Sequence, residues 1–329
     1  MTEHCLPRRQ FLGQAGLAAG AAMAGATAAR AGQGRHPGRA AQAGPAPAKG
    51  GPHLHISTNQ YPWSKFYERE GRDFRQSLDT GLGEVAASGL DGFEPSIASA
   101  ADVERLVPLL RKHGLQMRSI YMASTLHEPA KAETSIQTIL EAAERARRSG
   151  TKIVVTNVSP LRWGGPENKD DAQLKYQAGA LERLGRELYA RGMTLAYHSH
   201  DIEMRNAARE FHHMLAGTDP RYITLCLDAH WVYRGSGNST LALFDVLKLY
   251  GPRVSELHLR QSKNTIWTET FGEGDIDYPA MADYLAAIGV KPLLVLEQAP
   301  EKGTPKTMDA VEAHRRGVEY VRKVFAAFA

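Results

Sequence analysis

Four short apolar runs in the second half of the chain each end on a residue that could bind a metal. The four residues are His198, Asp228, His258 and Glu297. Imidazole and carboxylate groups together suit Mn, Zn, Co or Fe(II), and such sites keep open positions for a substrate. The set therefore predicts a divalent-metal site, provided that the fold brings the four runs side by side.

Strand periodicity adds two further histidines to this set. Side chains at positions i and i+2 of a strand share a face, so His200 is expected beside His198, and His230 beside Asp228. Each residue alone also has a structural explanation, because a lone histidine commonly makes a structural hydrogen bond and a lone aspartate can cap the next helix. Four ligand-type residues at the ends of four runs favour the metal site over these explanations.

The segments that position these residues alternate between apolar runs and amphipathic stretches, which predicts a parallel sheet. The expected strands are Leu54–Thr58, Gly92–Glu94, Gln116–Tyr121, Lys152–Asn157, Thr194–His198, Ile223–Asp228, Val254–His258 and Leu293–Glu297. Eight strand–helix units predict a single-domain (β/α)8 TIM barrel over residues 52–329, with the active site at the carboxyl ends of the strands. The alternative is a doubly wound sheet, which needs a glycine-rich phosphate turn after the first strand, and Ser57–Gln60 is not one.

The expected helices fill the intervals between these strands. They are Leu82–Ser88, Asp102–His113, Glu133–Ser149, Ala172–Arg191 and Met308–Phe328.

The N-terminus has the pattern of an export signal. Arg8 and Arg9 precede an uncharged run rich in Ala and Gly, and small-residue cleavage sites follow, the last of them at Ala31. This predicts a twin-arginine signal peptide over residues 1–31 and a periplasmic or otherwise exported protein. Residues 32–51, rich in Gly, Pro and Ala, are expected to form a disordered linker. No stable membrane span is expected after cleavage, because bulky apolar residues are few. A chance arginine pair before a leader is the alternative.

Charge and cysteine usage exclude two other classes. Residues 1–50 hold six Lys or Arg and one acid, a net of +5, while the whole chain is +4, so the rest sums to −1. A nucleic-acid partner is therefore not expected. Of the two cysteines, Cys5 lies in the predicted signal, which leaves Cys226 without a disulfide partner. Cys226 lies in an apolar stretch and is expected to be a core residue of a strand.

The run Tyr197–Glu203 resembles the Tyr-His-Asn-His-Asp-x-Glu signature of the sugar phosphate isomerase/epimerase-like, or xylose isomerase-like, TIM barrels. The resemblance extends from about His53 to the end of the chain. Supporting segments are Asp91–Glu94, Leu227–Trp231, His258–Leu259, Gly272–Asp277 and Leu296–Glu297.

In the ketose 3-epimerases of this superfamily, a Glu–Asp–His–Glu set binds the metal and the two glutamates move the proton. The resemblance places His198, Asp228, His258 and Glu297 at these positions. His198 thus replaces the first glutamate, and Ser199 stands where the signature has Asn. A proton shuttle between two glutamates is therefore not available in this chain.

The resemblance implies a metal-dependent isomerase or epimerase that abstracts a proton next to the carbonyl of a sugar or keto-sugar. The expected base is Glu297, the expected acid partners are His200, His230 or Lys263, and further substrate contacts are expected from Glu94, His230 and Asn157. The alternatives are a lyase or dehydratase of the inosose dehydratase kind, an endonuclease IV-like hydrolase, and a non-catalytic sugar-binding barrel. The expected partner is a small carbohydrate, and homo-oligomer formation stays open.

Overall fold

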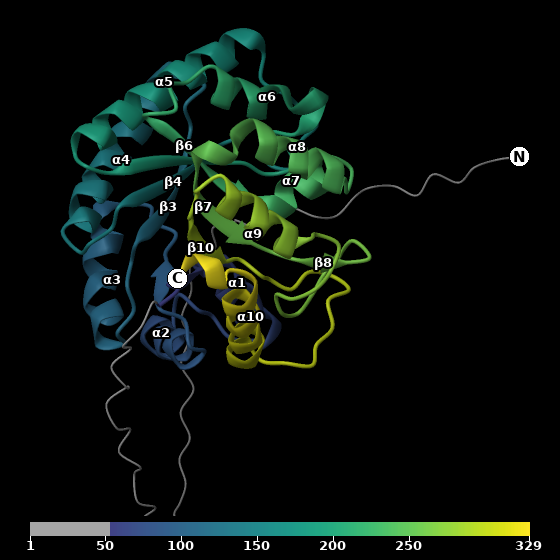
Figure 1. The fold of residues 1–329 in the computed structure, drawn as a ribbon. Coiled ribbons are helices and arrows are strands. Elements are labelled where there is room, and N and C mark those ends of the chain that lie inside the picture. The colour runs from purple at the N-terminus through teal and green to yellow at the C-terminus, as the bar shows by residue number, and fades with distance from the viewer. Residues whose placement is uncertain (1–52) are drawn as a thin grey trace, which may run out of the picture. The chain divides into compact units, whose positions relative to one another are not determined.

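A computed structural model describes residues 53–329, which form a barrel of parallel strands surrounded by helices (Figure 1). The barrel strands are β1 (Ile56–Asn59), β2 (Gly92–Glu94), β3 (Ser119–Ser124), β4 (Ile153–Val158), β5 (Thr194–His198), β6 (Ile223–Asp228), β7 (Val254–Leu259) and β10 (Leu293–Leu296). The predicted signal peptide and the predicted linker both fall on residues 1–52, outside the described residues.

The strands close into a ring. They pair in parallel in the order β2-β1-β10-β7-β6-β5-β4-β3. Isolated parallel bridges from Gly92 to Gln116 and from Ser96 to Tyr121 join the two edges. The predicted (β/α)8 barrel is confirmed, and the doubly wound alternative is excluded because such a sheet stays open at its edges.

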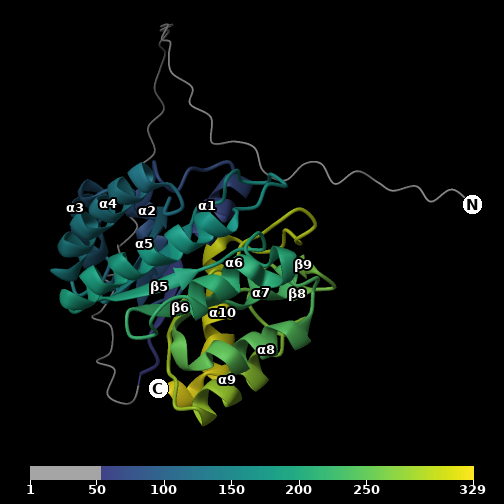
Figure 2. The same ribbon diagram turned by 90° about the horizontal axis from the view of Figure 1, so that it is seen from above.

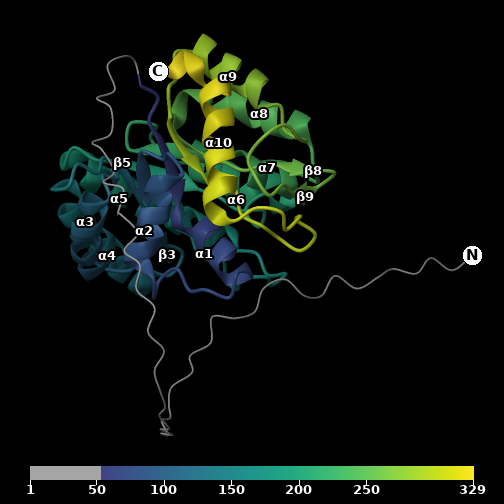
Figure 3. The same cartoon turned by 90° about the horizontal axis from the view of Figure 1, so that it is seen from below.

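Helices follow the strands around the outside of the barrel. They are α1 (Gln60–Arg69), α2 (Leu78–Ala87), α3 (Ala100–Lys112), α4 (Pro129–Arg147), α5 (Asp171–Ala190), α6 (Arg205–Ala216), α7 (Ala229–Gly235), α8 (Thr240–Tyr250), α9 (Tyr278–Ala287) and α10 (Ala310–Val324). Helices α3, α4 and α5 lie side by side along one flank (Figures 1 and 2), and α10 packs between α2, α1 and α9 (Figure 3). No helix among these residues is long and apolar enough to cross a membrane.

Local sequence sets where these helices begin and end. The Asp170 side chain accepts a hydrogen bond from the backbone of Gln173, whose own side chain returns to Asp170, and this capping box starts α5. Gly150 and Gly192 follow α4 and α5 with positive φ, the conformation that glycine commonly adopts where a helix ends. Gly92 does not have that role: it lies inside β2, where a Cβ would lie 2.5 Å from the Ser57 hydroxyl.

Near the carboxyl end of the barrel, an apolar layer of side chains lies directly below a layer of polar side chains. Val155, Ala196 and Cys226 form a small buried apolar cluster. Each of them lies two residues before a polar residue on the same strand, which places the polar side chains on the same inward face, one layer higher. Cys226 is thus a buried core residue, as expected, and burial raises the pKa of its thiol.

Candidate metal centre

Four side chains with metal-binding atoms converge at the carboxyl ends of neighbouring strands. His198 ends β5, Asp228 ends β6, His258 lies near the end of β7, and Glu297 directly follows β10. One ligand atom from each lies within 4.8 Å of the others, and all four residues are buried. We call these four residues the ligand cluster.

Two atoms of the ligand cluster are buried without a hydrogen-bond partner. They are Nε2 of His198 and Oδ2 of Asp228, which lie 3.8 Å apart. The other polar atoms of these side chains are engaged: Tyr121 Oη contacts His198 Nδ1 at 3.4 Å, and Asp228 Oδ1 accepts backbone N–H groups at the start of α7. A buried polar atom without a partner is costly, and a bound cation would satisfy both atoms. The residues therefore fit a divalent metal.

His258 is held by a carboxylate on each side. Its Nδ1 lies 2.6 Å from Glu297 Oε2, and its Nε2 lies 3.0 Å from Glu256 Oε1 and 3.2 Å from Glu94 Oε1. In metal sites the second ring nitrogen of a ligating histidine commonly donates to a carboxylate, which fixes the ring and its tautomer. The geometry thus directs Nδ1 toward the ligand cluster and Nε2–H toward the barrel interior.

The pKa values of the two interior glutamates are shifted in opposite directions. Burial opposes ionisation of Glu94, but His258 and a 2.6 Å hydrogen bond from Asn59 lower its pKa to about 2. Burial and the Glu94 charge raise the pKa of Glu256 well above its usual value. Glu94 was expected to contact the substrate, but it lies fully buried behind His258. Glu256 was not singled out from the sequence, although its i−2 position to His258 places it on the same face.

Arg260 is the principal site residue that the sequence analysis missed. Its guanidinium is fully buried, with Nη2 2.7 Å from Glu297 Oε1 and 3.8 Å from Asp228 Oδ2. It also lies over the rings of Trp267 and Trp231, at 4.3 and 5.0 Å. Neither terminal nitrogen has a hydrogen bond of good geometry, so both can donate to a bound oxygen.

The two additional histidines are neutral donors or acceptors at the edge of the ligand cluster. The His200 ring lies 4.8 Å from that of His198, and burial lowers its pKa well below the usual value. His230 lies in α7 rather than on a strand, and burial followed by the Arg260 charge lowers its pKa to about 3. Trp267 Nε1, which can only donate, lies 3.3 Å from His230 Nδ1. The proton of His230 is therefore on Nε2, which lacks a partner.

The remaining predicted site residues differ in position. Asn157, near the end of β4, is buried and pairs in register with His198. Lys263 is exposed on the short hairpin β8 (Ser262–Lys263) and β9 (Ile266–Trp267), and the structure does not bring it into the buried cluster. The hairpin lies beside α7 (Figures 2 and 3).

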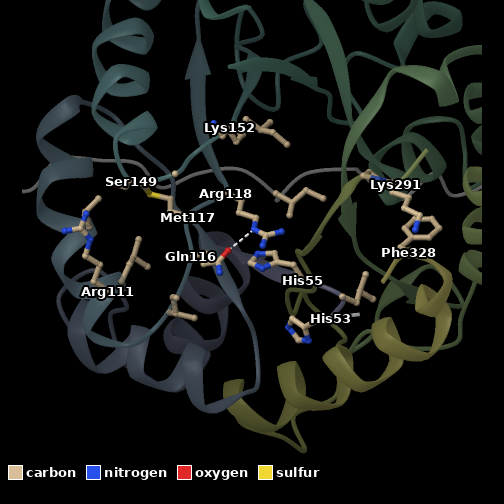
Figure 4. Close-up of a pocket in the computed structure, with 18 residues that line it drawn as sticks. His53, His55, Arg111, Gln116, Met117, Arg118, Ser149, Lys152, Lys291 and Phe328 are labelled. Carbon is tan, nitrogen blue, oxygen red and sulfur yellow. Dashed lines mark hydrogen bonds between the residues drawn. The ribbon is translucent and has the colours of Figure 1, made fainter. Parts of the chain in front are cut away.

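A cavity of about 780 Å³ opens at the opposite end of the barrel (Figure 4). Its lining includes Arg111, Arg118, Lys152 and Lys291, next to the amino ends of β3, β4 and β10. Active sites of this fold lie at the carboxyl ends of the strands, so this cavity is separate from the ligand cluster.

Glu203 lies in the loop after β5, and its pKa can be tested through the pH dependence of the free energy of unfolding. Burial and then Glu210 raise its pKa to about 8, from a usual 4.5. Because the folded pKa is raised, its contribution to stability is complete below about pH 4.5 and is lost as the pH rises to about 8. Compared with Glu203→Gln, the wild type should lose up to about 1.4 kcal/mol per pH unit in that window.

Urea unfolding of both proteins at pH 5 and pH 8 measures this difference. Glu319→Gln, on exposed helix α10, is the control and should show the same pH dependence as the wild type. A stability difference between wild type and Glu203→Gln that is equal at both pH values would contradict the assignment.

Comparisons with known proteins agree with the fold. A family model described as xylose isomerase-like TIM barrel matches residues 82–324. Inosose dehydratase of Mesomycoplasma hyopneumoniae (strain 7448) is 24% identical over 280 residues, covering 76% of this chain and 89% of that protein. A xylose isomerase-like TIM barrel protein from Mycobacterium smegmatis, in complex with magnesium, aligns with a TM-score of 0.64 at 15% identity, over 84% of this chain and 98% of that one. The 3-keto-D-glucoside 4-epimerase of E. coli aligns with a TM-score of 0.58 at 16% identity, over 82% and 100%.

Proposed function

The chain belongs to the xylose isomerase-like TIM barrel family, and from this premise we propose that it is a divalent-metal-dependent enzyme that abstracts a proton next to the carbonyl of a sugar or keto-sugar. The observation that carries the proposal is the ligand cluster, with its two buried atoms that lack a partner. A cation held there would polarise a substrate carbonyl and orient the neighbouring hydroxyl. The fold supplies these residues on rigid strand ends.

Glu297 is the proposed base. Its side chain is 10% exposed, whereas those of Asp228 and His258 are completely buried. Of the two carboxylates in the ligand cluster, it is thus the one that a substrate can reach. One carboxylate oxygen of Glu297 contacts His258 and the other contacts Arg260, so these two residues hold the carboxylate in one orientation. A carboxylate fixed in this way can take a proton without first reorganising.

Arg260 is proposed to stabilise the negative charge that develops on the carbonyl oxygen as the proton leaves. Its buried terminal nitrogen Nη2 lies 2.7 Å from Glu297 Oε1 and 3.8 Å from Asp228 Oδ2. A preorganised donor in a site without water contributes strongly to transition-state stabilisation. His230 Nε2–H and Asn157 are proposed to donate to substrate hydroxyls. Lys263 remains a candidate acid only if a loop movement brings its amine inward.

A dehydratase is the second candidate, and one feature of the ligand cluster favours it. His198 occupies the position of the first glutamate of the two-glutamate shuttle, so the group that exchanges protons together with Glu297 must be something other than a glutamate there. His200, a neutral imidazole beside His198, could receive a proton or protonate a leaving hydroxyl. The similarity to inosose dehydratase agrees with this alternative.

Incubation of the metal-loaded protein in D2O with a panel of keto-sugars, 3-keto-glucosides and inososes distinguishes these candidates. We expect deuterium at an α-carbon of at least one compound, detected by NMR. Recovery of a stereoisomer or positional isomer supports the isomerase or epimerase. Loss of water supports the dehydratase. Absence of deuterium in every compound, with metal bound, would contradict the proposal.

Export is also part of the proposal, since it restricts the substrate to compounds found outside the cytoplasm. Changing Arg8 and Arg9 to Lys should leave the protein in the cytoplasm, because the twin-arginine pathway recognises that arginine pair. Fractionation of cells that express each form measures the distribution. Deletion of residues 1–31 should give the same retention with an unchanged circular dichroism spectrum. Undiminished periplasmic recovery of the Lys-Lys form would argue against this route.

A further inference from the structure

An aromatic strip runs from the ligand cluster toward solvent. It consists of Trp267, Trp231, His200 and Trp163, with consecutive ring centroids 5.7, 5.6 and 5.0 Å apart. Trp267 is buried, whereas Trp163 is 46% exposed. The strip therefore begins next to Arg260, meets His198 at the His200 ring and ends at the surface.

Some exposed apolar side chains lie on segments that follow barrel strands at this end. Nine large hydrophobic side chains are exposed among residues 53–329, and four of them lie on such segments: Tyr61 in α1, Leu161 and Trp163 in the loop after β4, and Ile266 on β9. Isolated exposed apolar residues need no explanation. Leu161 and Trp163, however, share the loop between β4 and α5, so that loop presents two exposed apolar side chains beside the end of the strip.

Three cations on the segments around the strip are already paired with carboxylates. Arg234 binds Glu301 at 2.8 Å, Lys169 binds Glu210 at 2.6 Å, and Arg162 pairs with Glu167. A phosphate ester would thus have to compete with these carboxylates for those three cations. A neutral group with an apolar face would not.

We propose that the aromatic strip is the binding subsite for a second ring of the substrate, so that the enzyme acts on neutral glycosides rather than on free or phosphorylated monosaccharides. The inference rests on the proposed function, because the reacting ring is placed at the ligand cluster. Trp163 is two ring contacts from His198, at 4.8 and 5.0 Å, and a second ring would span that separation. The C–H groups on a sugar face, or at the edge of an aryl ring, carry partial positive charge and pack against the negative face of an indole.

Calorimetric binding of methyl and phenyl glucosides, both anomers of each, tests the subsite without requiring turnover. The metal-loaded protein without the predicted signal peptide should bind the phenyl compounds about tenfold more tightly than the methyl compounds, as expected for one added aromatic contact. Trp163→Ala should remove most of that preference, while Trp163→Phe should retain part of it. Tyr176→Ala, on the outer helix α5, is a matched loss of an exposed aromatic ring and should change neither affinity.

Equal binding of methyl and phenyl glucosides by the wild type would overturn the inference. A phenyl preference that survives in Trp163→Ala would also overturn it. The same holds if light scattering shows that loss of a dimer is the only change in Trp163→Ala, since the strip would then be an interface between copies. The D2O exchange experiment fails or succeeds separately from this one. A preference for phenyl glucosides without any α-deuteration would retain the subsite and reject the proposed chemistry.

Discussion

Glu297→Gln should reduce α-proton exchange into solvent by about 10²–10⁴-fold, the usual contribution of a positioned general base. Glutamine keeps the size of the side chain and one oxygen for the cation, but it cannot accept the proton. It also keeps an acceptor for Arg260 or His258, each of which contacts one carboxylate oxygen in the structure. Metal affinity should therefore fall only moderately, because His198, Asp228 and His258 remain.

Exchange must be measured at saturating metal, with occupancy determined on the same samples, so that lost metal cannot explain a lost rate. Glu319→Gln, which removes a carboxylate from the outer surface of α10, controls for the change in net charge. Exchange near the wild-type rate in fully metallated Glu297→Gln would show that Glu297 is not the base. The search would then turn to His200 and Lys263.

His258→Ala and Asp228→Ala should each lower metal affinity by more than about 100-fold, since loss even of a group that merely supports a ligand costs 10–100-fold. Activity should be lost with the metal. The barrel should persist in far-UV circular dichroism, because the residues that hold it together lie in the layers below and between strands and helices.

Asp228 has a second role that this experiment must separate. Its Oδ1 accepts the backbone N–H groups of His230 and Trp231, so alanine also removes the cap of α7. Such a loss costs about 1 kcal/mol of stability. Asp228→Asn retains a carbonyl oxygen for the cap and removes the charge, so it should lose metal with a smaller loss of stability. Full metal occupancy in His258→Ala and Asp228→Asn would place the centre elsewhere.

Where an apolar run ended cleanly on a polar residue, the sequence predicted the strands well. The bounds of β5 and β6 agree with the prediction, since each apolar run ends on a polar residue, His198 or Asp228. For β3 the predicted start was three residues early. Gln116 makes only an isolated bridge to Gly92, and pairing with β4 begins at Ser119.

Helix α1 was not among the predicted helices, and Pro62 lies in its first turn. Proline is tolerated there, since the first N–H groups of a helix have no partner within it. Helix α7 was missed because Asp228 both ends β6 and caps the helix at once. That sharp turn puts His230 on a helix and brings its ring against Trp267.

Arg260 shows what local pattern cannot reveal. An arginine after an apolar run suggests an exposed residue, and its burial depends on Glu297 and Asp228 from other strands and on rings from α7 and the hairpin. These partners are distant in sequence and meet only when the barrel closes. The one local signal was its i+2 position to His258, which places it on the inward face.

Metal add-back in D2O tests the central claim most directly. The protein is stripped with chelator, returned to increasing amounts of Mn, Zn, Co or Fe(II), and assayed for α-deuteration of whichever keto-sugar the wild type exchanges. We expect no exchange in the stripped protein and a rate that rises in proportion to occupancy, saturating at one ion per chain with at least one of these metals. Full exchange in the stripped protein, or one bound ion without exchange of any compound, would contradict that claim.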